Sequence, residues 1–169
     1  MSVELVNMSR ELFHELFRGF EYDPSVFADI ELFEKVRNTP YSREAVDAHF
    51  DRRLSRPNTL SFAVMLNGSV IGEVVFKNVD MNEGHCELGI HLINDSVKGK
   101  GFGTEAEKLA IEYAFNRLGM RTVLADTIIK NERSRHILEK LGFKKVCEKD
   151  NFFYYKLERD SYYADCTDR

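Results

Sequence analysis

A glycine-rich segment in the second half of the chain carries the strongest chemical signal. Lys98-Gly99-Lys100-Gly101-Phe102-Gly103-Thr104 follows a predicted strand and leads directly into a predicted helix. Backbone N–H groups at the start of a helix have no partner within it, and the helix dipole adds about half a positive charge there. Glycines let a bulky anion approach the backbone, so the segment predicts a phosphate-binding turn with two lysines at its mouth. A mobile surface turn is the alternative, because short glycine motifs often match by chance.

The spacing of these glycines excludes two common nucleotide sites. A Walker A loop needs Gly-x-x-x-x-Gly-Lys-Ser/Thr, and the chain contains no such string. The dinucleotide fingerprint Gly-x-Gly-x-x-Gly fails because Thr104 occupies the place of its third glycine. The remaining interpretation is a pyrophosphate-type ligand that is held mainly by main-chain amides.

The strand before the turn carries ionisable side chains on one of its faces. From His85 to Leu92 apolar residues alternate with polar ones, and Glu87 and His91 fall on the same polar face. Both are candidate general bases, since histidine titrates near neutral pH and a positioned carboxylate accepts a proton. The alternative is a purely structural role, in which Glu87 and His91 are polar residues of a half-buried strand that face solvent or hydrogen-bond within the protein.

Composition and charge narrow the classes of protein. The 169 residues are 43% hydrophobic and 31% charged, which predicts one folded domain over residues 1–169. With 24 basic and 28 acidic residues the net charge is −4, which argues against a nucleic-acid partner. No signal segment or membrane-spanning run is visible, so we expect a cytoplasmic protein without membrane association. Cys86, Cys147 and Cys166 are widely spaced and predict neither a disulfide framework nor a metal site.

Local signals predict the elements that must position these residues. The expected helices begin at Ser9, near residue 27, at Ser42, after the glycine turn and near Asn131; the expected strands span 61–66, 69–77, 85–92, 122–128, 143–147 and 152–157. Asn67-Gly68 predicts a two-residue hairpin turn. The polar stretch 159–169 is expected to be a flexible tail. This order predicts an α+β (α/β) domain with a mixed sheet flanked by helices.

Two motifs at the correct separation resemble the GNAT superfamily of acyltransferases. Lys98-x-x-Gly101-x-Gly103 resembles its Gln/Arg-x-x-Gly-x-Gly/Ala signature, which binds the pyrophosphate of acetyl-CoA. The segment from Asn131 to Phe143 is similar to the Asn-x-x-Ser…Leu-Glu-Lys-Leu-Gly-Phe segment of the RimJ/RimL-like branch, which acetylates N-terminal amines of ribosomal proteins. The resemblance covers about residues 87–145. It implies a strongly twisted mixed sheet whose fourth and fifth strands splay to admit the pantetheine arm.

The resemblance also implies roles for individual residues. The backbone of Ile90, Leu92 and Ile93 would pair with the pantetheine amides, while Asn131 and Ser134 would face the arm and the thioester. Helix capping is an equally good and compatible role for Asn131. The pyrophosphate would be held by the turn, whose members are Lys98, Gly99, Lys100, Gly101, Phe102, Gly103 and Thr104.

The implied reaction is acetyl transfer from acetyl-CoA to a primary amine by direct attack in a ternary complex, without a metal. The acceptor would be a protein N-terminal α-amine or a small-molecule amine such as a polyamine, and the enzyme a monomer or homodimer. Glu87 matches the catalytic glutamate of some GNAT branches, and His91 is the other candidate base. Many members carry a tyrosine at the position of Leu138, so here Ser134, Tyr154 or water would protonate the departing thiolate. The alternative is a catalytically weak acyl-CoA-binding sensor or accessory protein.

Overall fold

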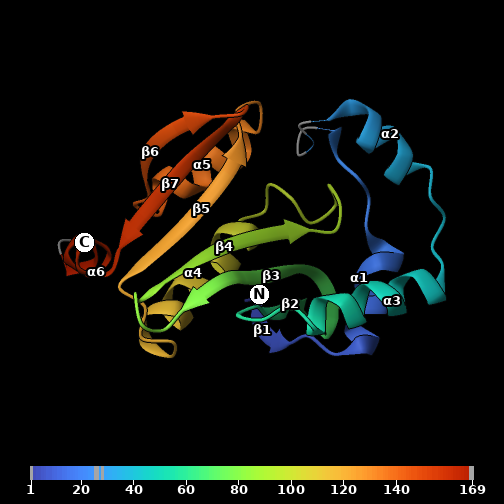
Figure 1. The fold of residues 1–169 in the computed structure, drawn as a ribbon, viewed down its shortest axis with the longest axis horizontal. Helices are drawn as coiled ribbons and strands as arrows, with labels where there is room; N and C mark the ends of the chain where they lie inside the picture. The colour runs from blue at the N-terminus through green and yellow to red at the C-terminus, as the bar shows by residue number, and fades with distance from the viewer. Residues whose placement is uncertain (1, 25–26, 28, 168–169) are drawn as a thin grey trace.

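A computed structural model describes residues 2–24, 27 and 29–167 (Figure 1). The elements follow one another as β1 (Glu4–Asn7), α1 (Arg10–Gly19), α2 (Ile30–Arg37), α3 (Arg43–Leu54), β2 (Leu60–Leu66), β3 (Ser69–Asp80), β4 (His85–Leu92), α4 (Phe102–Asn116), β5 (Thr122–Ile128), α5 (Glu132–Lys140), β6 (Lys144–Lys149), β7 (Phe152–Glu158) and α6 (Arg159–Thr167). Within the described ranges, no helix is both long and apolar enough to cross a bilayer.

The strands form one mixed sheet in the order β1-β2-β3-β4-β5-β7-β6. All neighbouring strands are antiparallel except β4 and β5, which run parallel and are connected through α4. The β2–β3 hairpin turns at Asn67 and Gly68, which both have positive φ, of 51° and 81°. That geometry requires residues that tolerate the left-handed region, so the predicted hairpin is confirmed.

Helices cover both faces of the sheet because side chains alternate along its strands. On β2, Phe62 and Val64 belong to the larger core cluster, which also contains buried residues of α4 and α5. Ala63 and Met65 point to the other face and pack with Phe13 of α1 and with buried residues of α3. The predicted mixed α/β architecture is therefore confirmed, with α4 and α5 on one face and α1 and α3 on the other (Figure 1).

The two parallel strands separate halfway along their length. β4 pairs with β5 only at His85↔Thr122, Cys86↔Val123 and Glu87↔Leu124. Beyond Glu87, β4 stays paired with β3 and β5 stays paired with β7, so the two halves of the sheet diverge. Figure 1 shows this splay as a widening gap between β4 and β5. Among the described residues, no strand pairs with this edge of β4 from Leu88 to Leu92.

Most predicted helix starts are confirmed, and two terminal elements differ from expectation. The side chains of Ser9 and Ser42 cap α1 and α3 by accepting from the N–H groups of Leu12 and Ala45. The stretch expected as a flexible tail forms α6 instead, and Tyr162 is buried against Phe115 of α4. Residues 168 and 169 of that stretch lie outside the described residues. The short edge strand β1, paired with β2, was not predicted from the sequence.

Candidate functional site

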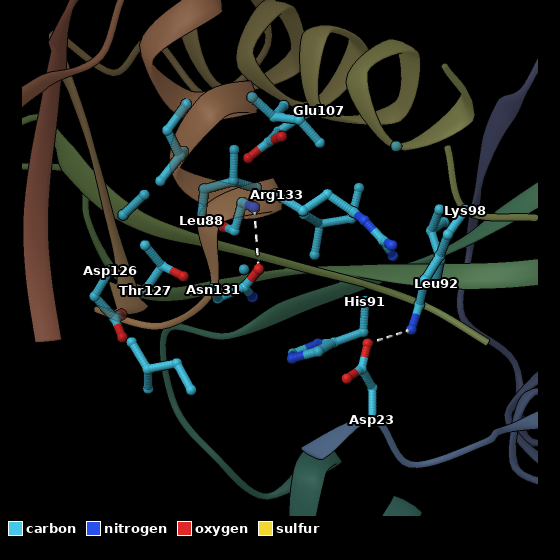
Figure 2. Close-up of a pocket in the computed structure, with 18 of the residues that line it drawn as sticks. Asp23, Leu88, His91, Leu92, Lys98, Glu107, Asp126, Thr127, Asn131 and Arg133 are labelled. Carbon is cyan, nitrogen blue, oxygen red and sulfur yellow. Dashed lines mark hydrogen bonds and ion pairs between the residues drawn. The ribbon is translucent and has the colours of Figure 1, made fainter. Parts of the chain in front are cut away.

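A cavity of about 270 Å³ occupies the splay between β4 and β5 (Figure 2). Its walls come from both diverging strands, from α4 and α5, and from the segment that follows α1. The lining residues include Leu88, Gly89, Ile90, His91 and Leu92 of β4, Ala125, Asp126, Thr127 and Ile128 of β5, Gly103 and Glu107 of α4, Asn131, Arg133, Ser134, Ile137 and Leu138 of α5, and Glu21, Asp23, Lys77 and Lys98. The predicted phosphate turn and the polar face of β4 therefore border one cavity.

The glycine turn has the conformation that an anion site needs. Gly99 and Gly101 have φ of 74° and 87°, a region that only glycine adopts without strain. Gly101 is the N-cap residue of α4, and among the described residues no side chain caps its first N–H groups. The side of Gly99 and Gly101 where a Cβ would lie is open among the described atoms. The first turn of α4 thus presents free amide donors beside Gly103, which lines the cavity.

The lysines of this turn differ in their surroundings. The Nζ atom of Lys98 lies 3.0 Å from Oδ2 of Asp23 and 3.4 Å from Oδ1 of Asp95, and only 14% of its side chain is exposed. Lys98 lines the cavity and links the segment after α1 to the turn (Figure 2). Lys100 is exposed and, like Thr104, does not line the cavity. Phe102 packs against the core, so its side chain supports the turn from beneath.

His91 is the candidate base that borders the cavity. Half of its side chain is exposed, and its Nδ1 atom lies 4.0 Å from Oε1 of Glu73 on β3. Glu73 is buried and accepts a hydrogen bond from Arg53 of α3. The protein atoms around the imidazole lower the pKa of His91, chiefly through desolvation, with Glu73 opposing that effect. A neutral imidazole at pH 7 is able to accept a proton.

Glu87, the other candidate base, lies elsewhere. It belongs to the half of β4 that is still paired with β5, and it does not line the cavity. Its Oε1 atom accepts a hydrogen bond of 2.8 Å from the side-chain amide of Asn78. The structure therefore brings His91, and not Glu87, to the splay.

Asn131, the N-cap of α5, and Ser134 line the cavity, whereas Ile93, which follows β4, does not. Asn131 Oδ1 accepts from the N–H of Ser134 at 3.1 Å, and both residues line the cavity, so capping and cavity roles coexist. Ile90 and Leu92 line the cavity as well. The backbone of Ile93, expected to pair with the pantetheine amides, donates its N–H to the carbonyl of Ile71 and accepts at its carbonyl from the N–H of Glu21.

Glu107, an acidic residue in the cavity wall, is not among the residues predicted from the sequence. Only 4% of Glu107 is exposed, and it has no hydrogen bond or ion pair with any of the described residues. Burial raises the pKa of this carboxyl to about 8. The available signal was its spacing, because residue 107 falls one turn after Gly103 and one turn before the buried Ile111. Three further lining residues are also not predicted: Lys77, Asp126 and the buried Thr127. No local sequence pattern shows where two neighbouring strands separate.

Comparison with known proteins gives consistent matches. A family model described as an acetyltransferase (GNAT) domain matches residues 4–144. The Bacillus subtilis protein YdaF, provisionally named a ribosomal N-acetyltransferase, is 30% identical over 101 residues, which are 60% of this chain and 55% of that protein. Spermidine N(1)-acetyltransferase of Escherichia coli K12 is 30% identical over 94 residues, 56% of this chain and 50% of that enzyme. The matches span about half the length of these two relatives.

The solved structures agree on the fold. The Campylobacter jejuni N-acetyltransferase PseH, solved in complex with acetyl coenzyme A, superposes with a TM-score of 0.66 at 23% identity. The match covers 93% of this chain and 99% of that one. At this level of identity the likeness shows that the two chains share a fold.

Proposed function

The chain belongs to the GNAT acetyltransferase family, and on that premise we propose that it transfers the acetyl group of acetyl-CoA to a primary amine. The amine would attack the thioester directly while both substrates are bound. One observation carries the proposal: the cavity in the β4–β5 splay is continuous with the uncapped first turn of α4. An extended ligand with an anionic end and an amide-containing arm matches that shape and those donors.

The coenzyme is proposed to lie along the open edge of β4. Its diphosphate would accept hydrogen bonds from the backbone N–H groups of residues 101–104, where the helix dipole favours negative charge. Its pantetheine amides would pair with the edge of β4 from Leu88 to Leu92, which in the described part of the chain has no strand partner on that side. Asn131 and Ser134 of α5 would flank the arm near the thioester.

His91 is proposed to accept the proton of the attacking amine. At pH 7, deprotonation costs about 1 kcal/mol for an α-amine but about 4.6 kcal/mol for a lysine-like amine, from their usual pKa values. A neutral imidazole at the cavity edge is therefore a sufficient base for an α-amine. Attack forms a C–N bond and an oxyanion, for which unpaired N–H groups of the β4 edge are suitable donors.

The acceptor is proposed to be a cationic primary amine. Asp23 and Asp126 line the cavity, and the carboxylate of Glu73 lies behind His91, so the cavity and its surroundings carry several carboxylates. The two relatives are named for acting on ribosomes and on spermidine, and both kinds of substrate offer primary amines. Peptide N-terminal α-amines and polyamines are therefore the two classes to test first.

The test measures release of CoA thiol from acetyl-CoA with a panel of peptides, polyamines and aminoglycosides. We expect release with at least one amine, and a loss of about 10²-fold or more in kcat for His91→Ala. The matched variant Glu87→Gln, on the same strand face but outside the cavity, should retain activity. Coenzyme binding without turnover of any amine would favour an acyl-CoA sensor, a role consistent with the apolar Leu138 in the cavity wall. Absence of both binding and turnover would refute the proposal.

A further inference from the structure

Glu107 is a buried ionisable group in the cavity wall to which the proposed reaction gives no role. Its side chain extends from α4 into the cavity, and no described residue neutralises it or hydrogen-bonds to it (Figure 2). A buried carboxyl without a partner is costly, and such groups concentrate where a protein needs them for binding or catalysis.

When the tetrahedral intermediate of acetyl transfer breaks down, the departing sulfur needs a proton donor. When the C–S bond breaks, its electron pair goes to sulfur, and the resulting thiolate must be protonated to leave as CoA thiol. In a cavity partly shielded from solvent an unprotonated thiolate is less well solvated than in water, so a nearby acid lowers the barrier. Leu138 and Ile137, which line the cavity from α5, have no proton to give.

The position of Glu107 relative to His91 suits separate roles, with His91 as the base and Glu107 as the acid. His91 lies on the face of the sheet that meets α3, because its neighbour Glu73 pairs with Arg53. Glu107 lies on the opposite face, with α4 and α5, and Figure 2 shows the two side chains on opposite sides of β4. A thioester placed in the splay would therefore meet the amine and its base from one side, and Glu107 from the other.

We propose that Glu107, in its protonated form, is the general acid that donates a proton to the departing thiolate; this inference rests on the proposed function. The carboxyl gives its proton to sulfur and becomes a carboxylate. It is reprotonated from solvent, while His91 releases the proton taken from the amine, so protons balance over the cycle. The raised pKa of Glu107, about 8, supports this role because it is close to the value of about 8.5 typical of a thiol, whereas an ordinary carboxyl would already be ionised at pH 7.

Other groups around the cavity are less suited to this step. The remaining ionisable side chains that line it are Lys77 of β3, His91 of β4, Asp126 of β5, Arg133 of α5, and Glu21, Asp23 and Lys98 beside the glycine turn. Asp126 and Arg133 are exposed, and Lys98 is engaged with Asp23 and Asp95. Glu107 is buried and protonated at neutral pH, which combines the two properties that a donor in this cavity needs.

The experiment measures kcat, KM for acetyl-CoA and CoA affinity from about pH 6 to pH 9 with the best amine found for the wild type. Glu107→Gln keeps the size and the hydrogen-bonding capacity but has no acidic proton. We expect kcat to fall about 10²-fold with KM and CoA affinity nearly unchanged. The decline of wild-type kcat above about pH 8 should be absent from this variant. Glu107→Asp, which keeps an acid, should recover part of the rate, and Glu112→Gln, on α4 outside the cavity, is the matched control.

The outcomes separate the inference from the proposed function. Wild-type kcat in Glu107→Gln would overturn the inference alone. A loss confined to KM or CoA affinity would also overturn it, because it would make Glu107 a binding group for the pantetheine arm. A wild-type protein that releases no CoA with any amine would refute both. If Glu107→Gln does not fold, the Glu107→Asp rate and the wild-type pH profile still decide, and a profile flat through pH 8 counts against the acid.

Discussion

Replacing Glu107 should make the unfolding free energy of this protein less dependent on pH. The ordinary pKa of a glutamate is 4.5, and burial in the cavity wall raises that of Glu107 to about 8. Between those values the unfolded chain loses the proton while the folded chain keeps it. The folded state then binds more protons than the unfolded state, so the unfolding free energy falls as pH rises.

The size of the effect follows from the width of that window. Each pH unit inside it lowers the unfolding free energy by about 1.4 kcal/mol. From about pH 5 to about pH 8, the ionisation of Glu107 alone should therefore lower the unfolding free energy by about 4 kcal/mol. For a chain of this length, 1 kcal/mol corresponds to about 2–4 °C in melting temperature, so the melting temperature should fall by about 8–16 °C over this pH range. Above pH 8 the folded state also ionises, and the dependence should level off.

The assay compares the wild type, Glu107→Gln and the control Glu112→Gln by chemical denaturation without ligand over that pH range. Taking the difference between each variant and the wild type cancels the titrating groups that the two proteins share. The stability of Glu107→Gln relative to wild type should rise by about 4 kcal/mol from pH 5 to pH 8, while Glu112→Gln should follow the wild type. Parallel curves for Glu107→Gln and wild type would mean that the carboxyl ionises normally and that burial does not raise its pKa.

Three further substitutions test other parts of the structure. Gly103→Glu should abolish the stabilisation that CoA gives the wild type, which is about 2.7 kcal/mol at a hundred times its Kd. Gly103→Ala should keep this stabilisation because the added Cβ makes only ordinary contacts. If CoA stabilises Gly103→Glu as much as the wild type, the coenzyme binds elsewhere. Glu73→Gln should cost about 3 kcal/mol in denaturant unfolding by leaving Arg53 partly buried without its carboxylate, and equal stability would contradict that role. Tyr162→Ala should cost about 3 kcal/mol if α6 packs as described, and Tyr163→Ala, less buried, should cost less.

The elements predicted correctly are those with local causes. Ser9 and Ser42 cap their helices through their own side chains, and Asn67-Gly68 turns the hairpin by adopting positive φ. These effects act within four residues and are visible in the sequence. By contrast, β1 is a strand only because β2 lies beside it, and α6 is ordered where Tyr162 meets Phe115, some fifty residues earlier in the chain. Such long-range contacts leave no periodic signal in the segment itself.

The candidate site divides in the same way. The glycine turn before α4 and the cap of α5 could be predicted because glycine spacing and Asn131 are local features. The alternation of β4 placed Glu87 and His91 on one face, but it could not show where β5 leaves β4. That separation follows Glu87, so Glu87 remains in the paired half of the strand while His91 stands in the open half.

The register of β3 and β4 connects the stability of the fold to the proposed chemistry. Glu73 lies opposite His91 in this register; its carboxylate pairs with Arg53 of α3, and its Oε1 atom is 4.0 Å from Nδ1 of the imidazole. Because side chains alternate with a period of two, a slip of one residue would turn His91 toward α4 and Leu88 toward α3. It would remove Leu88 from the core and His91 from Glu73 together. The burial that holds β4 in register therefore also keeps the proposed base on the face of the splay opposite to Glu107, and neither arrangement can change without the other.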